Sequence, residues 1–165
     1  MAIFNRMEHL EIERKYLVKS HEYIEKTLSK TRIVQGFLNT HPDRTVRVRI
    51  KGECGFLTVK GKSNDSGTSR FEWEQEIEKE EAFALMELCE PGIVDKHRYE
   101  VTFNGKLFEI DEFLGDNSGL ILAEVELEDE NEAFEKPSWL GKEVTGEVAY
   151  YNSQLIKKPY NQWKT

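Results

Sequence analysis

The feature that most constrains the fold of this chain is a two-residue alternation of charged and apolar side chains, which recurs eight times along its 165 residues. Successive side chains of a β-strand point to opposite faces, so each alternating segment predicts a strand with one charged face and one apolar face. Their short connections favour antiparallel pairing. The eight predicted strands span residues 10–16, 33–38, 45–50, 56–60, 70–77, 96–101, 107–111 and 122–127.

Four further segments predict helices, which makes the expected fold class α+β, and mainly β. They span residues 20–28, 80–88, 131–134 and 152–157. Ser20 is a typical N-cap residue for the first helix, and the second stops before Pro91. No repeat, low-complexity tract or long linker divides the chain, and 165 residues suit one domain with a substantial core. We therefore expect a single domain over residues 1–165.

The charged faces of the predicted strands are sorted by sign, with basic residues on some strands and acidic residues on others. A charged face in contact with water more often mixes the two signs, because like charges on neighbouring residues repel each other. The alternative is an ordinary antiparallel sheet with its charged face in water. In chain order the residues of the charged faces are Glu11, Glu13 and Lys15; Arg47 and Arg49; Lys60; Glu72 and Glu74; Lys96 and Arg98; Glu109 and Asp111; Glu124 and Glu126.

Eight strands can close into a barrel whose interior holds side chains or one small ligand. With the charged faces inward, six cations and eight carboxylates would share that interior, and helices would cover the apolar outer faces. Carboxylates at this density need compensation, and Mg²⁺ or Mn²⁺ suits a site rich in oxygen ligands. Several converging Lys and Arg side chains favour an anion with more than one phosphate. The pattern therefore predicts metal-assisted attack on a short phosphate chain.

The overall charge and hydropathy exclude other classes of partner. The chain carries 31 acidic and 23 basic side chains, a net charge of −8, which argues against duplex nucleic acid because neutralising phosphates requires a basic surface. No run of about 18 or more apolar residues exists, so we expect no membrane-spanning segment. Residues 1–6 lack the apolar region of a signal peptide, from which we expect a cytoplasmic protein.

A series of short motifs follows these strands in chain order. The motifs are ExExK at Glu11, Glu13 and Lys15; Arg47 with Arg49; the strand that ends at Lys60; RxExE at Arg70, Glu72 and Glu74; KxRY at Lys96, Arg98 and Tyr99; and the acidic pairs Glu109 with Asp111 and Glu124 with Glu126. In this order they resemble the motifs of the CYTH superfamily, also called triphosphate tunnel metalloenzymes. The resemblance covers about residues 8–158, where it places the core of the domain, and it implies an eight-stranded antiparallel closed barrel around a tunnel.

The resemblance also implies roles for individual residues. The metal ligands would be Glu11, Glu13, Glu124 and Glu126, with Glu72, Glu74 and Asp111 as further carboxylates. The triphosphate would be held by Lys15, Arg47, Arg49, Lys60, Lys96 and Arg98, and the catalytic group would comprise Lys15, Glu11 and Glu13. Short bacterial members of this appearance are usually inorganic triphosphatases. The expected reaction is therefore hydrolysis of tripolyphosphate to pyrophosphate and phosphate, dependent on Mg²⁺ or Mn²⁺.

Other functions of this fold stay open: an adenylyl cyclase of class IV type, a thiamine triphosphatase, or a non-catalytic module that binds polyphosphate or nucleotide. Two departures from the family pattern bear on them. Phe37 stands where short bacterial members often have tyrosine, which puts a step assisted by a phenol in question. Ala149 replaces an arginine that is common before the late Tyr-x-Asn, so one contact at the tunnel end is expected to be missing. The apolar outer faces also make a homodimer a reasonable expectation.

Overall fold

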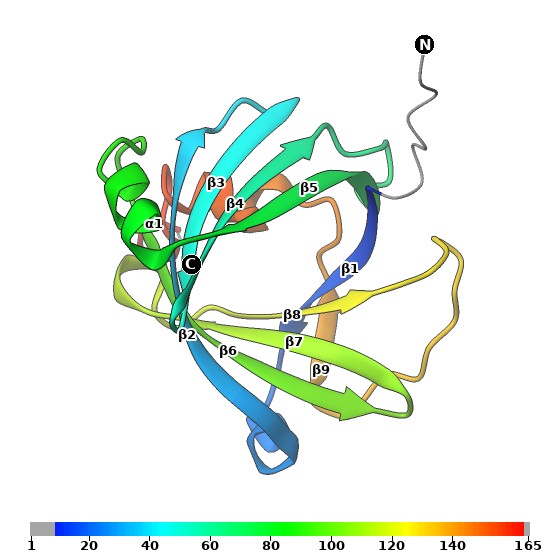
Figure 1. Cartoon of the computed structure of the whole chain (residues 1–165). Coiled ribbons are helices and arrows are strands. Elements are labelled where there is room, and N and C mark those ends of the chain that lie inside the picture. The colour runs from blue at the N-terminus through cyan, green and yellow to red at the C-terminus, as the bar shows by residue number, and fades with distance from the viewer. Residues whose placement is uncertain (1–8, 164–165) are drawn as a thin grey trace.

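The computed structural model describes residues 9–163, and within them nine strands form one antiparallel sheet (Figure 1). Residues 1–8 and 164–165 lie outside the described part, and with them residues 1–6, on which the expectation of a cytoplasmic protein rests. The strands are β1 (Leu10–Val18), β2 (Thr27–Asn39), β3 (Arg44–Lys51), β4 (Cys54–Gly61), β5 (Ser69–Ile77), β6 (Val94–Phe103), β7 (Lys106–Phe113), β8 (Ile121–Glu126) and β9 (Leu140–Glu143).

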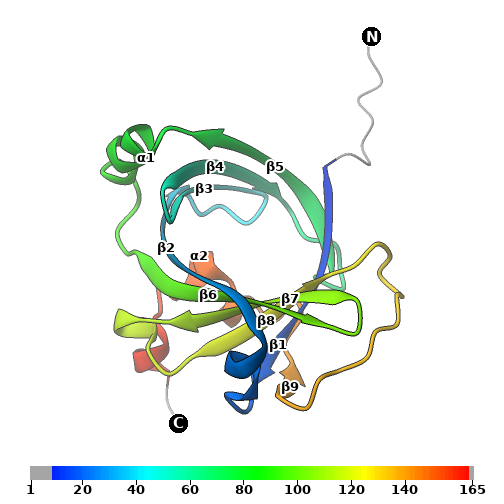
Figure 2. The ribbon, with the colours of Figure 1, turned by 60° about the horizontal axis from the view of Figure 1, so that its bottom comes forward.

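Eight of these strands close into a barrel, as the alternation predicts. The strand order is β5-β4-β3-β2-β6-β7-β8-β1, and the ring closes because the first residues of β1 pair with β5, Glu11 opposite Arg70 (Figure 2). The rest of β1 pairs with β8, so β1 links the two halves of the ring. The ninth strand, β9, was not predicted; it pairs with the end of β1 at Tyr16 and Val18.

The apolar outer face of β3 and β4 is covered by helix α1 (Lys79–Met86). A reciprocal capping box between Glu78 and Glu81 fixes the start of this helix. Ala82 is fully buried against the sheet at Gly55, where an added Cβ would lie 2.8 Å from the Ala82 Cβ. The predicted helix at 80–88 is therefore confirmed, although Phe83 points to solvent and is 54% exposed.

The opposite wall of the barrel is covered by chain without α-helix. The segment that joins β8 to β9 runs as turns and extended chain, so the predicted helix at 131–134 is wrong. Phe134 packs its ring edge-on against Tyr16 and Phe108 instead, and Trp139 packs against Phe108 with ring centroids 5.3 Å apart. Aromatic packing on the outer face of the barrel thus decides the path of this segment.

The predicted helix at 20–28 is also wrong. Only η1 (Glu22–Lys26) is helical there, as a 3-10 turn whose Tyr23 is buried against Tyr99 and Trp139. Strand β2 begins at Thr27, where Thr or Ser stands at every second position up to Thr31, and threonine suits a strand better than a helix. Three further 3-10 turns are η2 (Gly115–Asn117), η3 (Val148–Tyr150) and η4 (Tyr160–Gln162).

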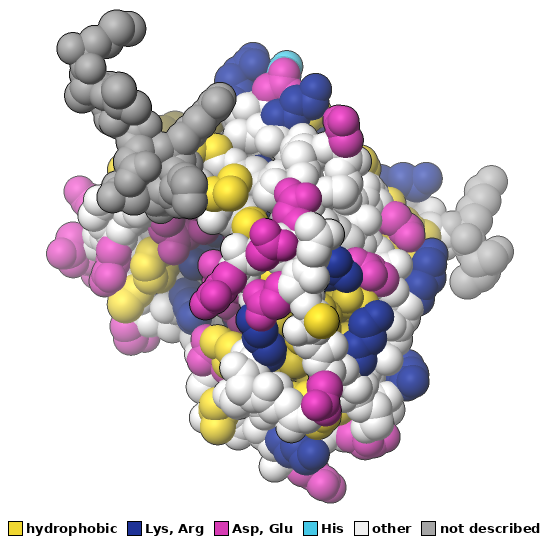
Figure 3. Space-filling model, turned by 90° about the vertical axis from the view of Figure 1, so that its right-hand side faces the viewer, with side chains coloured by type: hydrophobic (Ala, Val, Ile, Leu, Met, Phe, Trp, Pro, Cys, Tyr) yellow, Lys and Arg dark blue, Asp and Glu magenta, His cyan; other side chains and the backbone are white. Residues whose placement is uncertain are grey.

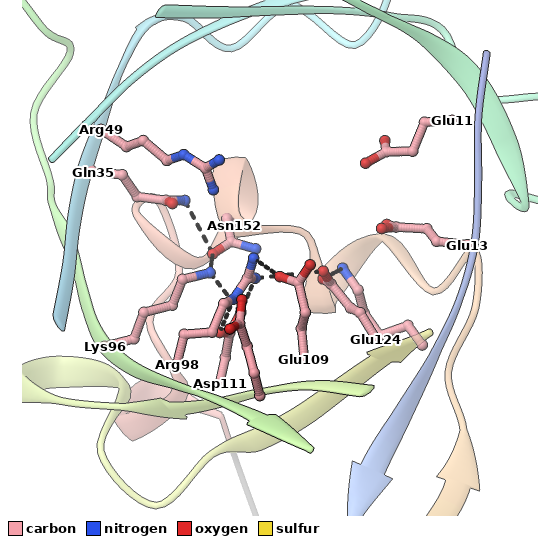
Figure 4. Close-up of polar contacts among 12 residues, drawn as sticks. Glu11, Glu13, Gln35, Arg49, Lys96, Arg98, Glu109, Asp111, Glu124 and Asn152 are labelled. Atoms are coloured by element: carbon pink, nitrogen blue, oxygen red, sulfur yellow. Dashed lines mark hydrogen bonds and ion pairs between the residues drawn. The ribbon is translucent and has the colours of Figure 1, made fainter. Parts of the chain in front are cut away.

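The last predicted helix exists but lies in an unexpected place. Helix α2 (Asn152–Leu155) covers part of the predicted span 152–157. Sequence reasoning placed the helices outside the barrel, whereas α2 sends Asn152 into the tunnel (Figure 4). The C-terminal segment therefore helps to build the interior of the barrel as well as its outer surface.

One outer face stays largely uncovered within the described residues. Leu10, Phe71 and Trp73, on β1 and β5, are 50%, 44% and 36% exposed. The homodimer expected from such faces stays a prediction. No helix of residues 9–163 has the length and apolar character needed to cross a membrane.

Candidate active site

The charged faces of the strands point into the barrel, where they line a cavity of about 590 Å³. A narrower space of about 50 Å³ continues from it toward the Tyr151–Ser153 end. Figure 4 shows Glu11 and Glu13 reaching into the tunnel from β1, opposite Arg49 of β3. Ten of the residues predicted for the site line the wide part: Glu11, Glu13, Arg47, Arg49, Lys60, Glu72, Glu74, Arg98, Glu124 and Glu126.

The other three predicted residues lie deeper. Lys15 and Lys96 line the narrow part of the tunnel, together with ten charged or polar neighbours that include Asn152. Asp111 lines neither part, because it is only 1% exposed and lies beneath Lys96 and Arg98. The structure thus brings the predicted set together around one tunnel, with Asp111 behind its wall.

The two arginines of β3 are held by a single carboxylate of β5. Glu74 accepts hydrogen bonds from the Arg49 Nη2 at 3.1 Å and from the Arg47 Nη2 at 3.3 Å. The Thr58 hydroxyl donates to the same carboxylate at 2.6 Å. Burial opposes ionisation of Glu74, but Arg49 and the Thr58 hydrogen bond outweigh it and lower the pKa of the carboxyl. Glu74 is therefore an ionised counter-charge that fixes the direction of two guanidinium groups.

A second pair of cations, on β6, is held in the same way by Asp111 of β7. The Lys96 Nζ donates to Asp111 Oδ2 at 2.6 Å, and the Arg98 Nε and Nη2 donate to the two oxygens at 2.7 Å each. Burial lowers the pKa of Lys96 to about 8, with a contribution from the nearby Arg98 and an opposing one from Asp111. Arg98 also pairs with Glu109 and, at 3.6 Å, with Glu124.

The carboxylates of β1 and β8 differ in how fully nearby basic side chains compensate their negative charge. Burial opposes ionisation of Glu11, but Lys60 and Arg70 outweigh it and lower the pKa of its carboxyl to about 2. Among the described residues, the salt bridge of Glu13 is a long one, 3.8 Å from the Arg70 Nη2. Burial, with the charges of Glu124 and Glu11, raises the pKa of Glu13 to about 7. Glu13 therefore marks a part of the tunnel where negative charge is only partly compensated.

The donor set of the tunnel fits a hard divalent cation, because it offers carboxylate oxygens and an excess of negative charge at Glu13. In residues 9–163, however, no three His, Cys, Asp or Glu side chains converge closely enough to hold a metal ion. The reason is visible in the ion pairs: Glu11 faces Lys60 at 2.9 Å, and Glu124 faces Lys15 at 3.0 Å. The ligand chemistry is present, and the carboxylates are turned toward the basic side chains.

Sequence reasoning left out several residues that make polar contacts in the tunnel, among them Arg70, Gln35 and Asn152. Arg70 opens the RxExE motif and shares the inward face of Glu72, so the alternation itself could have found it. Gln35 is fully buried and donates to the Asn152 Oδ1 at 3.1 Å, and the Lys96 Nζ donates to the same oxygen at 3.1 Å. Asn152 belongs to no alternating strand, and its one signal in the sequence is the late Tyr-x-Asn of the family pattern, which ends at this residue.

The two departures from the family pattern lie in different environments. Phe37 is buried and lines the narrow part of the tunnel beside Lys15 and Asn152. Ala149 is exposed in η3 and lies near Lys158 and Trp163 on the outer surface. The departure at Phe37 therefore changes the tunnel wall, and the departure at Ala149 changes a position that lines neither part of the tunnel.

Comparison with known proteins places the chain in a family. The model of the CYTH domain matches residues 9–160. The chain belongs to the CYTH family. Among its CYTH relatives, the inorganic triphosphatase of Acetivibrio thermocellus is 47% identical over 156 residues, which cover 93% of this chain and 97% of that protein. The inorganic triphosphatase of Nitrosomonas europaea is 38% identical over 149 residues, which cover 88% of this chain and 95% of that protein.

Comparison with solved structures supports the same fold. The crystal structure of an inorganic triphosphatase matches with a TM-score of 0.64 and 34% identity, over 88% of this chain and 93% of that chain. A conserved hypothetical protein from Pyrococcus furiosus, 16% identical, matches with a TM-score of 0.60 over 73% of this chain and 80% of its own, which bears on the fold alone. The closed CYTH barrel expected from the motifs is therefore confirmed.

Proposed function

We propose that this CYTH protein hydrolyses inorganic tripolyphosphate to pyrophosphate and phosphate inside the barrel. The observation that carries the proposal is the pair of cation clamps, Arg47 with Arg49 and Lys96 with Arg98, each fixed by one carboxylate and facing the partly uncompensated Glu13. Relatives that are named inorganic triphosphatases over nearly the whole length of the chain support the same reaction.

In the proposed reaction a water oxygen bonds to a terminal phosphorus while the bond from that phosphorus to the bridging oxygen breaks, and pyrophosphate leaves. The arginines bind phosphate oxygens through two N–H groups each, and Lys15, Lys60 and Lys96 add point charges. Negative charge builds on the leaving oxygens in the transition state. Side chains already fixed by Glu74 and Asp111 stabilise that charge without reorganising, which lowers the barrier.

CYTH triphosphatases are a metalloenzyme class, and we propose Mg²⁺ or Mn²⁺ as the cofactor here. Glu11, Glu13, Glu124 and Glu126 would hold it, with Glu72 as a further carboxylate. When bound, such an ion polarises phosphoryl oxygens and activates water. Of the carboxylates predicted as metal ligands, we assign Asp111 and Glu74 to positioning instead. Asp111 lies behind the tunnel wall under Lys96 and Arg98, and Glu74 already accepts hydrogen bonds from Arg47, Arg49 and Thr58. Lys15 stays in the proposed catalytic group through its 3.0 Å contact with Glu124.

The alternatives gain less support from the tunnel. An adenylyl cyclase needs a surface for adenine, and among the described residues that line the wide cavity the apolar side chains are Leu107 and Leu127. A thiamine triphosphatase would need a comparable surface for thiamine. A module that only binds polyphosphate would gain nothing from Glu13, whose charge opposes an anion.

The test is a panel of metals against substrates. We expect phosphate release from tripolyphosphate with Mg²⁺ or Mn²⁺, loss of the activity in excess EDTA, and slower release from ATP, pyrophosphate and thiamine triphosphate, with cyclic AMP measured in the ATP samples. Glu13→Gln should abolish the activity. Glu112→Gln is the matched control, because Glu112 lies next to Asp111 in β7 and lines neither part of the tunnel. Equal turnover in EDTA would contradict the metal dependence, and an inactive wild type would contradict the function.

A further inference from the structure

Arg70 occupies the space between the two carboxylates of the ExExK motif. Its Nε lies 3.2 Å from the Glu11 Oε2, and its Nη2 lies 3.8 Å from the Glu13 Oε1. Arg70 and Glu11 are direct partners across the seam where β1 and β5 close the barrel. A guanidinium group thus stands where Glu11 and Glu13 would otherwise offer oxygens to a metal.

The surroundings of Arg70 hold it in this place. The ring of Tyr151 lies 6.0 Å from the guanidinium carbon, and the backbone N–H of Glu13 donates to the Thr68 carbonyl at 2.9 Å just before β5 begins. The loop that contains Thr68 is packed closely against the C-terminal segment, since a Cβ on Gly67 would lie 2.4 Å from the Gly146 Cα. Arg70 therefore contacts Glu11 and Glu13 as part of an ordered wall.

We propose that Arg70 is a built-in counter-cation that competes with the divalent metal for Glu11 and Glu13. The inference rests on the proposed metal-dependent function. Together with the pairs of Lys60 with Glu11 and of Lys15 with Glu124, it helps to explain why the carboxylates do not converge in residues 9–163, because Glu11 and Glu13 both contact this guanidinium. A metal that binds these carboxylates must first displace the guanidinium or tolerate its charge nearby, and either lowers the affinity of the empty tunnel for metal.

The same competition couples the binding of metal and substrate. Arg70 lines the narrow part of the tunnel together with Lys15 and Lys60, so a phosphate group bound there offers its guanidinium a new partner. A substrate phosphate that pairs with Arg70 draws the guanidinium away from the Glu11 and Glu13 carboxylates. These carboxylates then bind the metal more tightly. By linkage, the metal raises the affinity for the phosphate chain by the same factor. The enzyme accordingly assembles its metal site fully only when the triphosphate is present.

The test measures Mn²⁺ binding by titration calorimetry with no phosphate compound present. We expect Arg70→Gln to bind Mn²⁺ about tenfold more tightly than the wild type, a difference of about 1.4 kcal/mol. Arg70→Lys keeps the charge and should bind within about twofold of the wild type. Arg32→Gln is the matched control, because Arg32 pairs with Asp95 through two hydrogen bonds on the surface of the barrel. It removes one positive charge without touching the tunnel, and its Mn²⁺ affinity should equal that of the wild type.

A second measurement needs no variant. In a crystal structure of the wild type with Mn²⁺, the guanidinium of Arg70 should lie beyond hydrogen-bond distance of Glu11 and Glu13. Equal or weaker Mn²⁺ binding by Arg70→Gln, no binding by either protein, or Mn²⁺ bound to Glu11 with Arg70 still in place would each overturn the inference. If Arg70→Gln binds more tightly but the wild type does not hydrolyse tripolyphosphate, the proposed function fails and the competition stands.

Discussion

Replacing Asp111 by Asn tests whether the tunnel cations depend on one buried carboxylate. Asp111 is 1% exposed and Lys96 is 2% exposed, and the carboxylate accepts hydrogen bonds from Lys96 and from two nitrogens of Arg98. The Asn side chain has nearly the same shape but no charge. One of its two polar atoms is an N–H donor, which would face a cation. The variant therefore removes the ion-pair partner of the buried Lys96 and leaves Arg98 with its other pairs, Glu109 and Glu124.

The expected magnitude follows from the burial of these groups. Removing one partner of a buried ion pair costs about 3–5 kcal/mol, because the remaining charge is left uncompensated. For a chain of this size, 1 kcal/mol lowers Tm by about 2–4 °C, so Asp111→Asn should lower Tm by roughly 6–20 °C. The kcat/KM for tripolyphosphate should fall as well, since Lys96 and Arg98 lose the group that aims them.

The assay is urea unfolding at neutral pH, with Asp95→Asn as the matched control. Asp95 makes two hydrogen bonds to Arg32, but the side chains of Arg32 and Asp95 are 62% and 29% exposed. A pair on the surface contributes only about 0–1 kcal/mol, so the control should unfold near the wild type. If Asp111→Asn lost no more stability than Asp95→Asn, the claim that Asp111 compensates the tunnel cations would be refuted.

Two further predictions concern the segments that close the tunnel. Gly67→Ala should destabilise by about 2 kcal/mol or more in thermal unfolding, because the backbone there has φ +73° and the new Cβ would meet Gly146. Gly105→Ala, at φ +79° with open space around it, should lose only about 1 kcal/mol, and equal losses would argue against the close packing of the two segments. Asn152→Leu removes the acceptor that Gln35 and Lys96 share, and urea unfolding should show a loss of about 1–3 kcal/mol. Wild-type stability of that variant would mean that the shared acceptor contributes nothing.

The barrel could be predicted from the sequence because its strands obey a local rule. Alternation fixes which face of each strand is apolar. Eight such strands can close into a barrel with the charged faces inside, or they can lie as an open sheet with the charged face in water. The alternation could not show structure that depends on packing between residues far apart in the sequence. Strand β9 has four residues, too few to display a period, and Phe134 lies in extended chain because of rings that arrive from β1 and β7.

The residues that belong to the site could be predicted from the same alternation, but the ion-pair partner of each charged side chain could not. Inward positions follow from spacing, so Glu74 and Asp111 were found along with Glu13. Which carboxylate holds a guanidinium and which remains uncompensated depends on cross-strand register, such as Arg98 opposite Asp111 between β6 and β7. Asn152 shows the other limit, because it enters the tunnel from a short helix that carries no charge pattern.

The net charge of −8 acquires a different meaning once the tunnel is separated from the surface. On the face shown in Figure 3, acidic and basic side chains lie interspersed. Along the inward faces of the strands, the eight carboxylates found from the sequence meet the six predicted cations and Arg70, which leaves one negative charge in excess. A divalent cation added to that set would make the tunnel positive. An acidic protein can therefore bind a polyanion, provided that metal and phosphate enter together, which is the coupling that Arg70 would impose.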